Sequence, residues 1–147
     1  MKNFETTKKA LNRARRWYQG AIRAFEDERW DDVVYSYEMA VEQALKGILI
    51  LYGIEYPKKH DISGLLLILE EMDVPDFFSK KIDKYAQILN ILVKKRGPAA
   101  YGYVEGIKKE EFKEDAINLR SNVEEILDNC ERLFDQFIDK NSNSNTS

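Results

Sequence analysis

The strongest constraint on the fold is a repeat of apolar residues near the C-terminal end of the chain. Over about residues 109–139 they recur three and four positions apart through three heptads, a spacing that places them on one face of an α-helix. The residues of this face are Ala116, Leu119, Val123, Ile126, Cys130, Leu133 and Phe137. We expect one long helix that packs lengthwise against partner helices, with Cys130 as a small buried residue and not a nucleophile.

Four further segments carry apolar residues at helical spacing, and no useful length of chain alternates as a β-strand does. The expected segments are about residues 6–27, a helix from an N-cap at Asp31 or Asp32 to Gly53, a short helix after an N-cap at Asp61, and a helix from Pro75 to the pair Gly97 and Pro98. We expect this pair to end its helix, because proline disfavours helical geometry at the residue before it.

These segments together predict an all-α protein, an antiparallel bundle of about five helices. The chain has 147 residues and fits one domain, which we expect over residues 1–140. The remaining stretch, NSNSNTS, has nothing apolar to bury. We therefore expect residues 141–147 to form a disordered polar tail.

The charge of the chain limits how it can meet nucleic acid. A net charge of −3 does not give the broad positive field of non-specific binders, so any RNA contact must be local. The basic clusters, each also typical of a solvated helix face or helix end, are Arg13, Arg15 and Arg16; Lys58 and Lys59; and Lys94, Lys95 and Arg96. No apolar run reaches the roughly 18 residues of a membrane span, and the N-terminus has no apolar stretch of signal-peptide type. With one cysteine and no internal disulfide, we expect a cytoplasmic protein without membrane contact.

Side chains for metal or cofactor chemistry are not grouped in the sequence. One histidine and one cysteine of an apolar helix face cannot supply a zinc site, and there is no phosphate loop or dinucleotide fingerprint. His60 lies just before a predicted helix, and we interpret it as a residue that braces a loop. The expectation is therefore no metal and no cofactor.

The stretch RGPAAYGY, residues 96–103, has two interpretations. In the first, the basic residues before it complement the negative end of a helix, Gly97 and Pro98 stop that helix, and the two tyrosines pack the following loop onto the bundle. In the second, Arg96, Tyr101 and Tyr103 form a functional segment. The residues alone leave both interpretations open.

A family resemblance bears on this choice. The segment SYEMAVEQALKGILILYG, with Glu42 and Lys46 four residues apart, resembles the HEPN family of small helical proteins, the "higher eukaryotes and prokaryotes nucleotide-binding" domains. Trp17, the stretch of residues 60–66 and the long last helix fall in the family's order, so the likeness covers about residues 6–139. A Glu and a Lys at this spacing are also a generic helix-stabilising pair, so a structural role for both stays open.

The resemblance gives RGPAAYGY a chemical meaning. Ribonuclease members of the family have an arginine followed after four to six residues by a histidine, and one toxin subgroup has a tyrosine two residues beyond. Arg96 stands at the arginine position, Tyr101 at the position of the histidine and Tyr103 at that of the tyrosine. Gly97 replaces the polar residue that often follows the arginine.

The implied reaction is metal-independent RNA cleavage, with Arg96 as the cation at the phosphate and Tyr101 in the place of the catalytic base. A tyrosine in water titrates near pH 10, so only about one in a thousand is ionised at pH 7. We therefore expect weak or absent ribonuclease activity, with nucleotide or RNA phosphate still bound by Arg96, Tyr103, Glu42 and Lys46.

The resemblance also implies partners. Toxin-like members act as homodimers beside a small nucleotidyltransferase, which in some cases attaches a nucleotide to the tyrosine near the motif, here Tyr103 or Tyr101. The alternatives are a non-catalytic nucleotide-binding module and a helical interaction module.

Overall fold

The computed structural model describes residues 2–56 and 58–145. They form six α-helices and three short 3-10 helices, and no strand occurs among them, which confirms the all-α prediction. The elements are α1 (Lys2–Glu26), α2 (Trp30–Leu51), α3 (Ser63–Leu66), η1 (Leu67–Glu71), α4 (Asp76–Ser79), α5 (Ile82–Tyr101), η2 (Gly102–Glu105), η3 (Lys109–Phe112) and α6 (Lys113–Asn145).

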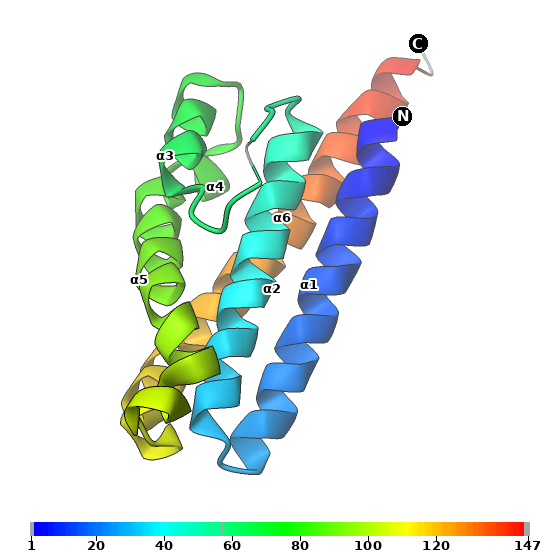
Figure 1. Cartoon of the computed structure of the whole chain (residues 1–147). Helices are drawn as coiled ribbons and strands as arrows, with labels where there is room; N and C mark the ends of the chain where they lie inside the picture. Colours follow the sequence, from blue (N-terminus) through cyan, green and yellow to red (C-terminus); the bar gives the residue numbers. More distant parts are fainter. Residues whose placement is uncertain (1, 57, 146–147) are drawn as a thin grey trace.

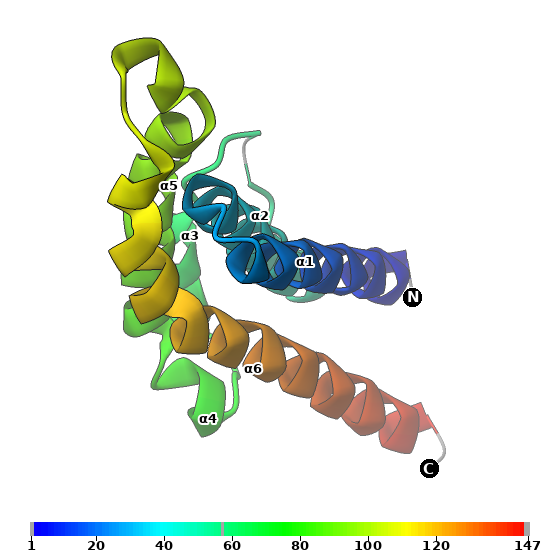
Figure 2. The ribbon, with the colours of Figure 1, turned by 90° about the horizontal axis from the view of Figure 1, so that it is seen from below.

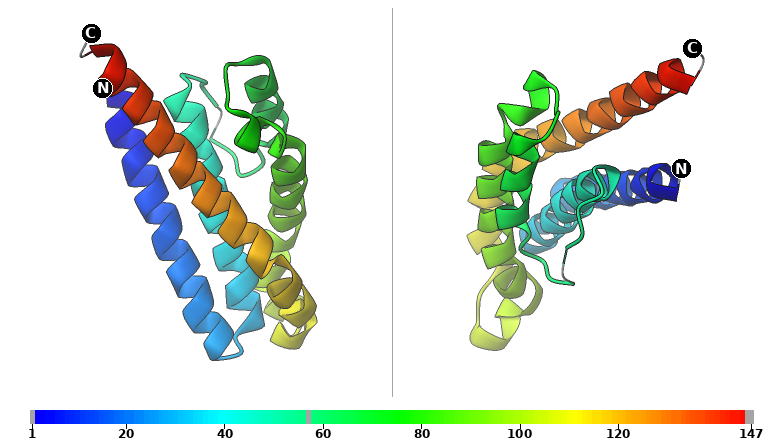
Figure 3. Two further views of the ribbon diagram at one scale, coloured as in Figure 1. Left: turned by 180° about the vertical axis from the view of Figure 1, so that it is seen from behind. Right: turned by 90° about the horizontal axis from the view of Figure 1, so that it is seen from above.

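The four long helices form an antiparallel bundle. α1 and α2 make a hairpin, and α5 lies on the other side of α2, so that α2 runs between α1 and α5 (Figures 1 and 2). α6 crosses diagonally behind the hairpin and brings the two ends of the chain to the same end of the bundle (Figure 3). None of the described helices is long and apolar enough to cross a membrane.

The core is centred on α2, which packs against α1, α5 and α6. Its Tyr37 is fully buried and donates a hydrogen bond from its hydroxyl to the carbonyl oxygen of Ala116 in α6, at 2.8 Å. The apolar face of α6 meets α2 and α1 as its heptad spacing predicts. Cys130 of this face is completely buried, which confirms its assignment to the core.

A glycine lets α1 and α2 approach closely near their common end. A Cβ atom on Gly47 would lie 3.1 Å from the Cβ of Ala10, closer than almost all side-chain contacts. The buried Thr7 hydroxyl donates to the Gly47 carbonyl oxygen at 2.9 Å. The buried hydroxyl of Thr7 therefore has a hydrogen-bond partner on the neighbouring helix, and this bond also joins the two helices where they approach closely.

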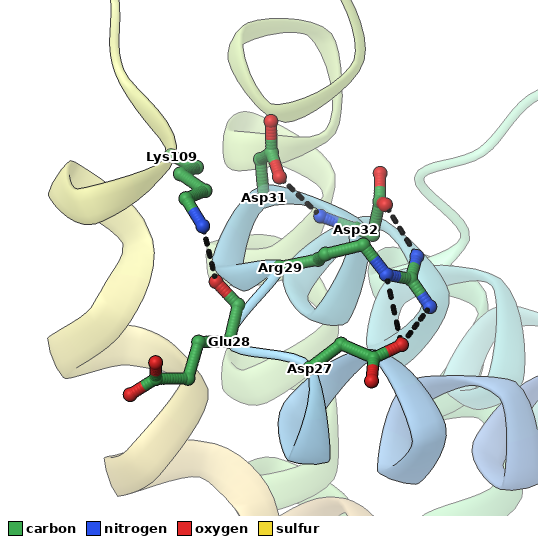
Figure 4. A network of polar contacts seen from close by, with 6 residues as sticks. All are labelled: Asp27, Glu28, Arg29, Asp31, Asp32 and Lys109. Atoms are coloured by element: carbon green, nitrogen blue, oxygen red, sulfur yellow. Dashed lines mark hydrogen bonds and ion pairs between the residues drawn. The ribbon is translucent and has the colours of Figure 1, made fainter.

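The predicted N-cap of α2 is wrong by two or three residues. α2 begins at Trp30 with Arg29 as its N-cap residue, and Asp31 and Asp32 lie inside the first turn. There the carboxylates complement the positive helix end, and the Arg29 guanidinium donates to Asp32 at 2.6 Å (Figure 4). Lys109 donates to the carbonyl oxygen of Glu28 and so fastens η3 to this turn (Figure 4).

The predicted helix from Pro75 to Gly97 is also corrected at both ends. Pro75 starts only the short α4, and α5 then runs through Gly97 and Pro98 to Tyr101. Pro98 lies in the last turn of α5, where its missing N–H removes a single helical hydrogen bond. The next residue, Ala99, is buried, so packing on the core holds the last turn in helical form.

The predicted ends of two other helices are close to those in the structure. α2 stops before Gly53, whose φ of 72° lies in the left-handed region that favours glycine. Asp61 lies one residue before the N-cap of α3 and accepts a hydrogen bond from the Ser63 N–H at 3.0 Å. At the C-terminus, α6 extends to Asn145, into the predicted tail, while residues 146–147 lie outside the described residues.

Candidate functional site

Arg96 lies in the last part of α5, and its side chain reaches across to α2. One terminal nitrogen donates to the hydroxyl of Tyr35 at 3.2 Å, and the guanidinium carbon lies 5.1 Å from the centre of the Tyr35 ring. The Nε atom lies 3.4 Å from a carboxyl oxygen of Glu38. The side chain is only 23% exposed. Arg96 is therefore held between two helices, unlike a solvated arginine at a helix end.

Two glutamates on successive turns of α2 form the floor of this site. The carboxyl groups of Glu38 and Glu42 are 0% and 4% exposed. Glu42 accepts a hydrogen bond from Lys46 Nζ at 2.9 Å, and its other oxygen lies 2.7 Å from Nδ1 of His60. The structure thus places Glu42 beside Lys46, and it adds His60 from the loop before α3.

The two carboxyl groups differ in protonation. Burial and the neighbouring Glu42 carboxylate raise the pKa of Glu38. Burial alone would also raise the pKa of Glu42, but hydrogen bonds from Glu38, Lys46 and His60 outweigh it and lower that pKa. The two shifts are opposite in direction, so Glu38 is the carboxyl of the pair that holds a proton more readily.

The buried Glu38 carboxyl has few polar contacts. Neither of its oxygens accepts a hydrogen bond of ordinary geometry among the described residues, and Arg96 Nε is also unpaired by that criterion although it lies 3.4 Å from one of them. A proton on one of two neighbouring carboxyls removes their mutual repulsion, which is why the pKa of Glu38 is raised beside Glu42.

The cluster contains two basic and two acidic side chains, Arg96 and Lys46 beside Glu38 and Glu42. The raised pKa of Glu38 shifts the balance of charge toward positive. Oxygen and nitrogen atoms of Glu38, Glu42 and His60 lie within 4.8 Å of one another and include the donor types that bind metal ions. Arg96 and Lys46 already supply the positive charge that a cation would bring, so the arrangement suits an anion better than a divalent metal ion.

The two tyrosines of RGPAAYGY lie outside this cluster. Tyr101 is 65% and Tyr103 73% exposed, and neither hydroxyl has a hydrogen bond within the described residues. Gly102 between them is buried, and a Cβ atom there would lie 2.9 Å from the Cβ of Ile107. Because the glycine faces inward, both tyrosines project into solvent. Their assignment to the site stays a prediction.

The sequence interpretation missed three participants. Glu38 lies one helical turn before Glu42, as Lys46 lies one turn after, and this i, i+4, i+8 series of charged residues on an otherwise apolar helix was the available signal. Tyr35 lies three residues before Glu38 and so belongs to the same face of the helix. We interpret His60 from the sequence as a residue that braces a loop, and in the structure its ring contacts Glu42 of α2 directly.

Comparisons with known proteins agree with this architecture. A family model described as HEPN domain matches residues 7–133. A protein of Methanocaldococcus jannaschii named "Putative toxin MJ1304" is 29% identical over 132 residues, which cover 86% of each chain. No solved structure matches the chain significantly. Because the family model spans most of the sequence, with both Glu42 and Arg96 inside the matched range, the chain belongs to the HEPN domain family.

Proposed function

We propose that this chain is a toxin-like HEPN protein that binds the phosphate groups of RNA or of a nucleotide at Arg96. The observation that carries the proposal is the position of Arg96, whose side chain is held between α5 and α2 by the ring and hydroxyl of Tyr35 and stays 23% exposed. Its contacts with Tyr35 and Glu38 leave other N–H donors of the guanidinium for a phosphate. The name of the M. jannaschii relative supports the toxin-like role.

The chemistry of such a site is metal-independent cleavage of RNA. A base takes the proton of a ribose 2′-hydroxyl, and the resulting oxygen attacks the adjacent phosphorus to form a 2′,3′-cyclic phosphate. The bond from phosphorus to the 5′-oxygen of the next nucleotide breaks, this oxygen takes up a proton, and Arg96 stabilises the charge that develops on the phosphate. Tyr101 stands in the place of the base. It is well exposed to water and has no hydrogen-bond partner among the residues that the structure describes, so we propose that cleavage is weak and that binding is the main activity.

Regulation by a partner is part of the proposal. A hydroxyl that accepts a nucleotidyl group must be accessible, and Tyr103 satisfies this condition with 73% exposure. A small nucleotidyltransferase would transfer the nucleotide to Tyr103 and release pyrophosphate. We also propose that the chain forms a homodimer, in which the second copy covers the exposed apolar side chain of Val104 and leaves the Tyr103 hydroxyl accessible.

Purified protein with labelled RNA tests the central proposal. We expect Arg96→Ala to weaken RNA or nucleotide binding about ten- to a hundredfold, because a charge-assisted contact contributes about 1–3 kcal/mol. Arg132→Ala is the matched control, since Arg132 also stacks on an aromatic ring, that of Phe77, but lies in α6 away from the cluster. Unchanged binding in Arg96→Ala would mean that residues 96–103 have a purely structural role.

Expression in cells tests the toxin-like role separately. Expression of the wild-type chain alone should arrest growth, and co-expression of a small nucleotidyltransferase should relieve the arrest. If the chain binds nucleotide, does not cleave RNA and does not affect growth, the second candidate function applies, a non-catalytic nucleotide-binding module. The exposed position of Tyr101 is the observation that favours this alternative.

A further inference from the structure

The most asymmetric feature of the charge distribution lies on α1. Residues 6–25 contain six basic residues and no acidic one, in a chain whose net charge is −3. The basic residues are Lys8, Lys9, Arg13, Arg15, Arg16 and Arg23. Arg15 is neutralised by two carboxylates of α6. Lys9, Arg13 and Arg16 are exposed and lie on one helix face, and no ion pair involves them among the described residues.

A series of ring contacts connects this face to Arg96. The guanidinium of Arg13 lies over the ring of Trp17, 5.4 Å from its centre. Trp17 in turn meets the ring of Tyr35 edge to face, with 6.1 Å between the ring centres. Tyr35 is the residue on which Arg96 stacks. The series therefore passes from α1 over α2 to α5, the three helices that lie side by side in Figure 1.

Both terminal arginines of this series lie against an aromatic ring; Arg13 has no ion pair among the described residues, and Arg96 approaches one carboxyl, that of Glu38, through Nε at 3.4 Å. A ring orients a guanidinium through cation–π attraction and leaves most of its N–H donors free. The alternation of cations and partly exposed aromatic rings is the pattern with which proteins hold unpaired nucleic acid strands, since cations contact phosphates and rings stack on bases. Paired RNA does not offer its base faces for such stacking.

We infer that the ligand of the Arg96 site is a single RNA strand of several nucleotides, which continues from Arg96 across Tyr35 and Trp17 to Arg13 and Arg16. This inference rests on the proposed phosphate binding at Arg96 and specifies its substrate class. A single nucleotide cannot reach both ends of the series, because α2 separates α1 from α5. Arg13 thus contributes to the binding of a strand but not to that of a mononucleotide.

The test compares two probes on the full-length protein, a fluorescent RNA strand of about ten unpaired nucleotides and a nucleoside monophosphate. Arg13→Ala should weaken binding of the strand about tenfold and lower the salt dependence by about one phosphate contact, with mononucleotide binding unchanged. Arg96→Ala should weaken both. Arg132→Ala removes another ring-stacked arginine and should change neither by more than about twofold.

The outcomes separate the two proposals. If Arg96→Ala weakens the binding of both probes and Arg13→Ala leaves the binding of the strand unchanged, the strand does not continue to Arg13, and phosphate binding at Arg96 stands. If Arg96→Ala affects neither probe, the proposed function itself fails. Equal affinity for the mononucleotide and the strand would also contradict a binding surface that extends from Arg96 to Arg13. Arg13→Lys should retain part of the affinity for the strand, which a loss of helix structure would not allow.

Discussion

Two arginines connect helices in different interfaces of the bundle, and their partners differ in charge. Arg15 of α1 donates to Glu131 and Asp128 of α6 at 2.8 and 2.9 Å. Burial alone would lower the pKa of Arg15, but these hydrogen bonds outweigh it and raise the pKa. Arg96 of α5 instead meets the hydroxyl of Tyr35 and the carboxyl of Glu38, whose pKa is raised by burial. Arg15 joins two helices through ionised partners, whereas we propose that Arg96 keeps its charge for a ligand.

The difference between the two arginines depends on the proton of Glu38, and Glu38→Gln tests it with the largest expected effect. Because burial raises the pKa of Glu38 in the folded chain, unfolding releases this proton above about pH 4.5, and the wild type loses stability as pH rises. A glutamine at this position can still donate a hydrogen bond to Glu42, but its side chain does not titrate. The stability advantage of Glu38→Gln should grow by up to about 1.4 kcal/mol per pH unit between pH 5 and pH 8, as measured by urea unfolding.

Glu42→Gln is the matched control for this measurement. The pKa of Glu42 is lowered, so its titration affects stability only below about pH 4.5 and not in the same pH range. This variant should be destabilised, because Lys46 and His60 lose their ionised partner, and the loss should not grow between pH 5 and pH 8. If the difference in stability between Glu38→Gln and the wild type does not change with pH, Glu38 is ionised, and Arg96 has an ionised partner as Arg15 does.

Arg15→Ala should separate stability from binding. Its ion pairs are partly exposed and screened by water, so we expect a loss of about 1 kcal/mol in the free energy of unfolding. RNA affinity should stay within about twofold of the wild type. A large loss of affinity in Arg15→Ala would show that the neutralised arginine also serves the ligand and would remove the distinction.

Thiol labelling of Cys130 reports on the same interface with a smaller signal. The thiol is fully buried on α6, and burial raises its pKa, so it reacts only when the bundle opens. Arg15→Ala should increase the labelling rate about fivefold, in line with about 1 kcal/mol, and Arg96→Ala should change it less. Labelling of the native wild type as fast as a free thiol would contradict the burial of Cys130.

The smallest effect is expected for Tyr101→Phe. The Tyr101 hydroxyl is exposed and has no hydrogen-bond partner in the described part of the chain, so its removal should change RNA affinity by less than about twofold. Tyr101→His should instead raise any cleavage, because an imidazole accepts a proton near neutral pH. Strong wild-type cleavage that disappears in Tyr101→Phe would make this tyrosine the base of the reaction.

Much of the fold followed from apolar spacing, because burial alone decides where such residues lie. The face of α6 with Cys130 and the pairing of Glu42 with Lys46 were predictable from a fixed helical period. The continuation of α5 through Pro98 was not, since it depends on the burial of Ala99 against residues distant in sequence. Local propensity was outweighed there by tertiary packing.

The site was less predictable than the fold, because its chemistry arises where three segments meet. Nothing in the sequence around Glu38 indicates that α5 will bury it, and without burial its carboxyl would be an ordinary anion. Likewise His60 reaches Glu42 only after the loop before α3 folds back over α2. The motif around Arg96 lies on α5, but the residues that its side chain contacts, Tyr35 and Glu38, lie on α2 and are not part of the motif.

The close contact of Gly47 with Ala10 has a consequence for the order of folding. α1 and α2 are adjacent in sequence and joined by a short turn, so their hairpin closes at little entropic cost and can form before α5 leaves the ribosome. Trp17 and Tyr35 would then already touch, while Glu38 would still be hydrated and ionised. Docking of α5 would bury this carboxyl and raise its pKa, so the site would come to favour a proton on Glu38 only when Arg96 arrives.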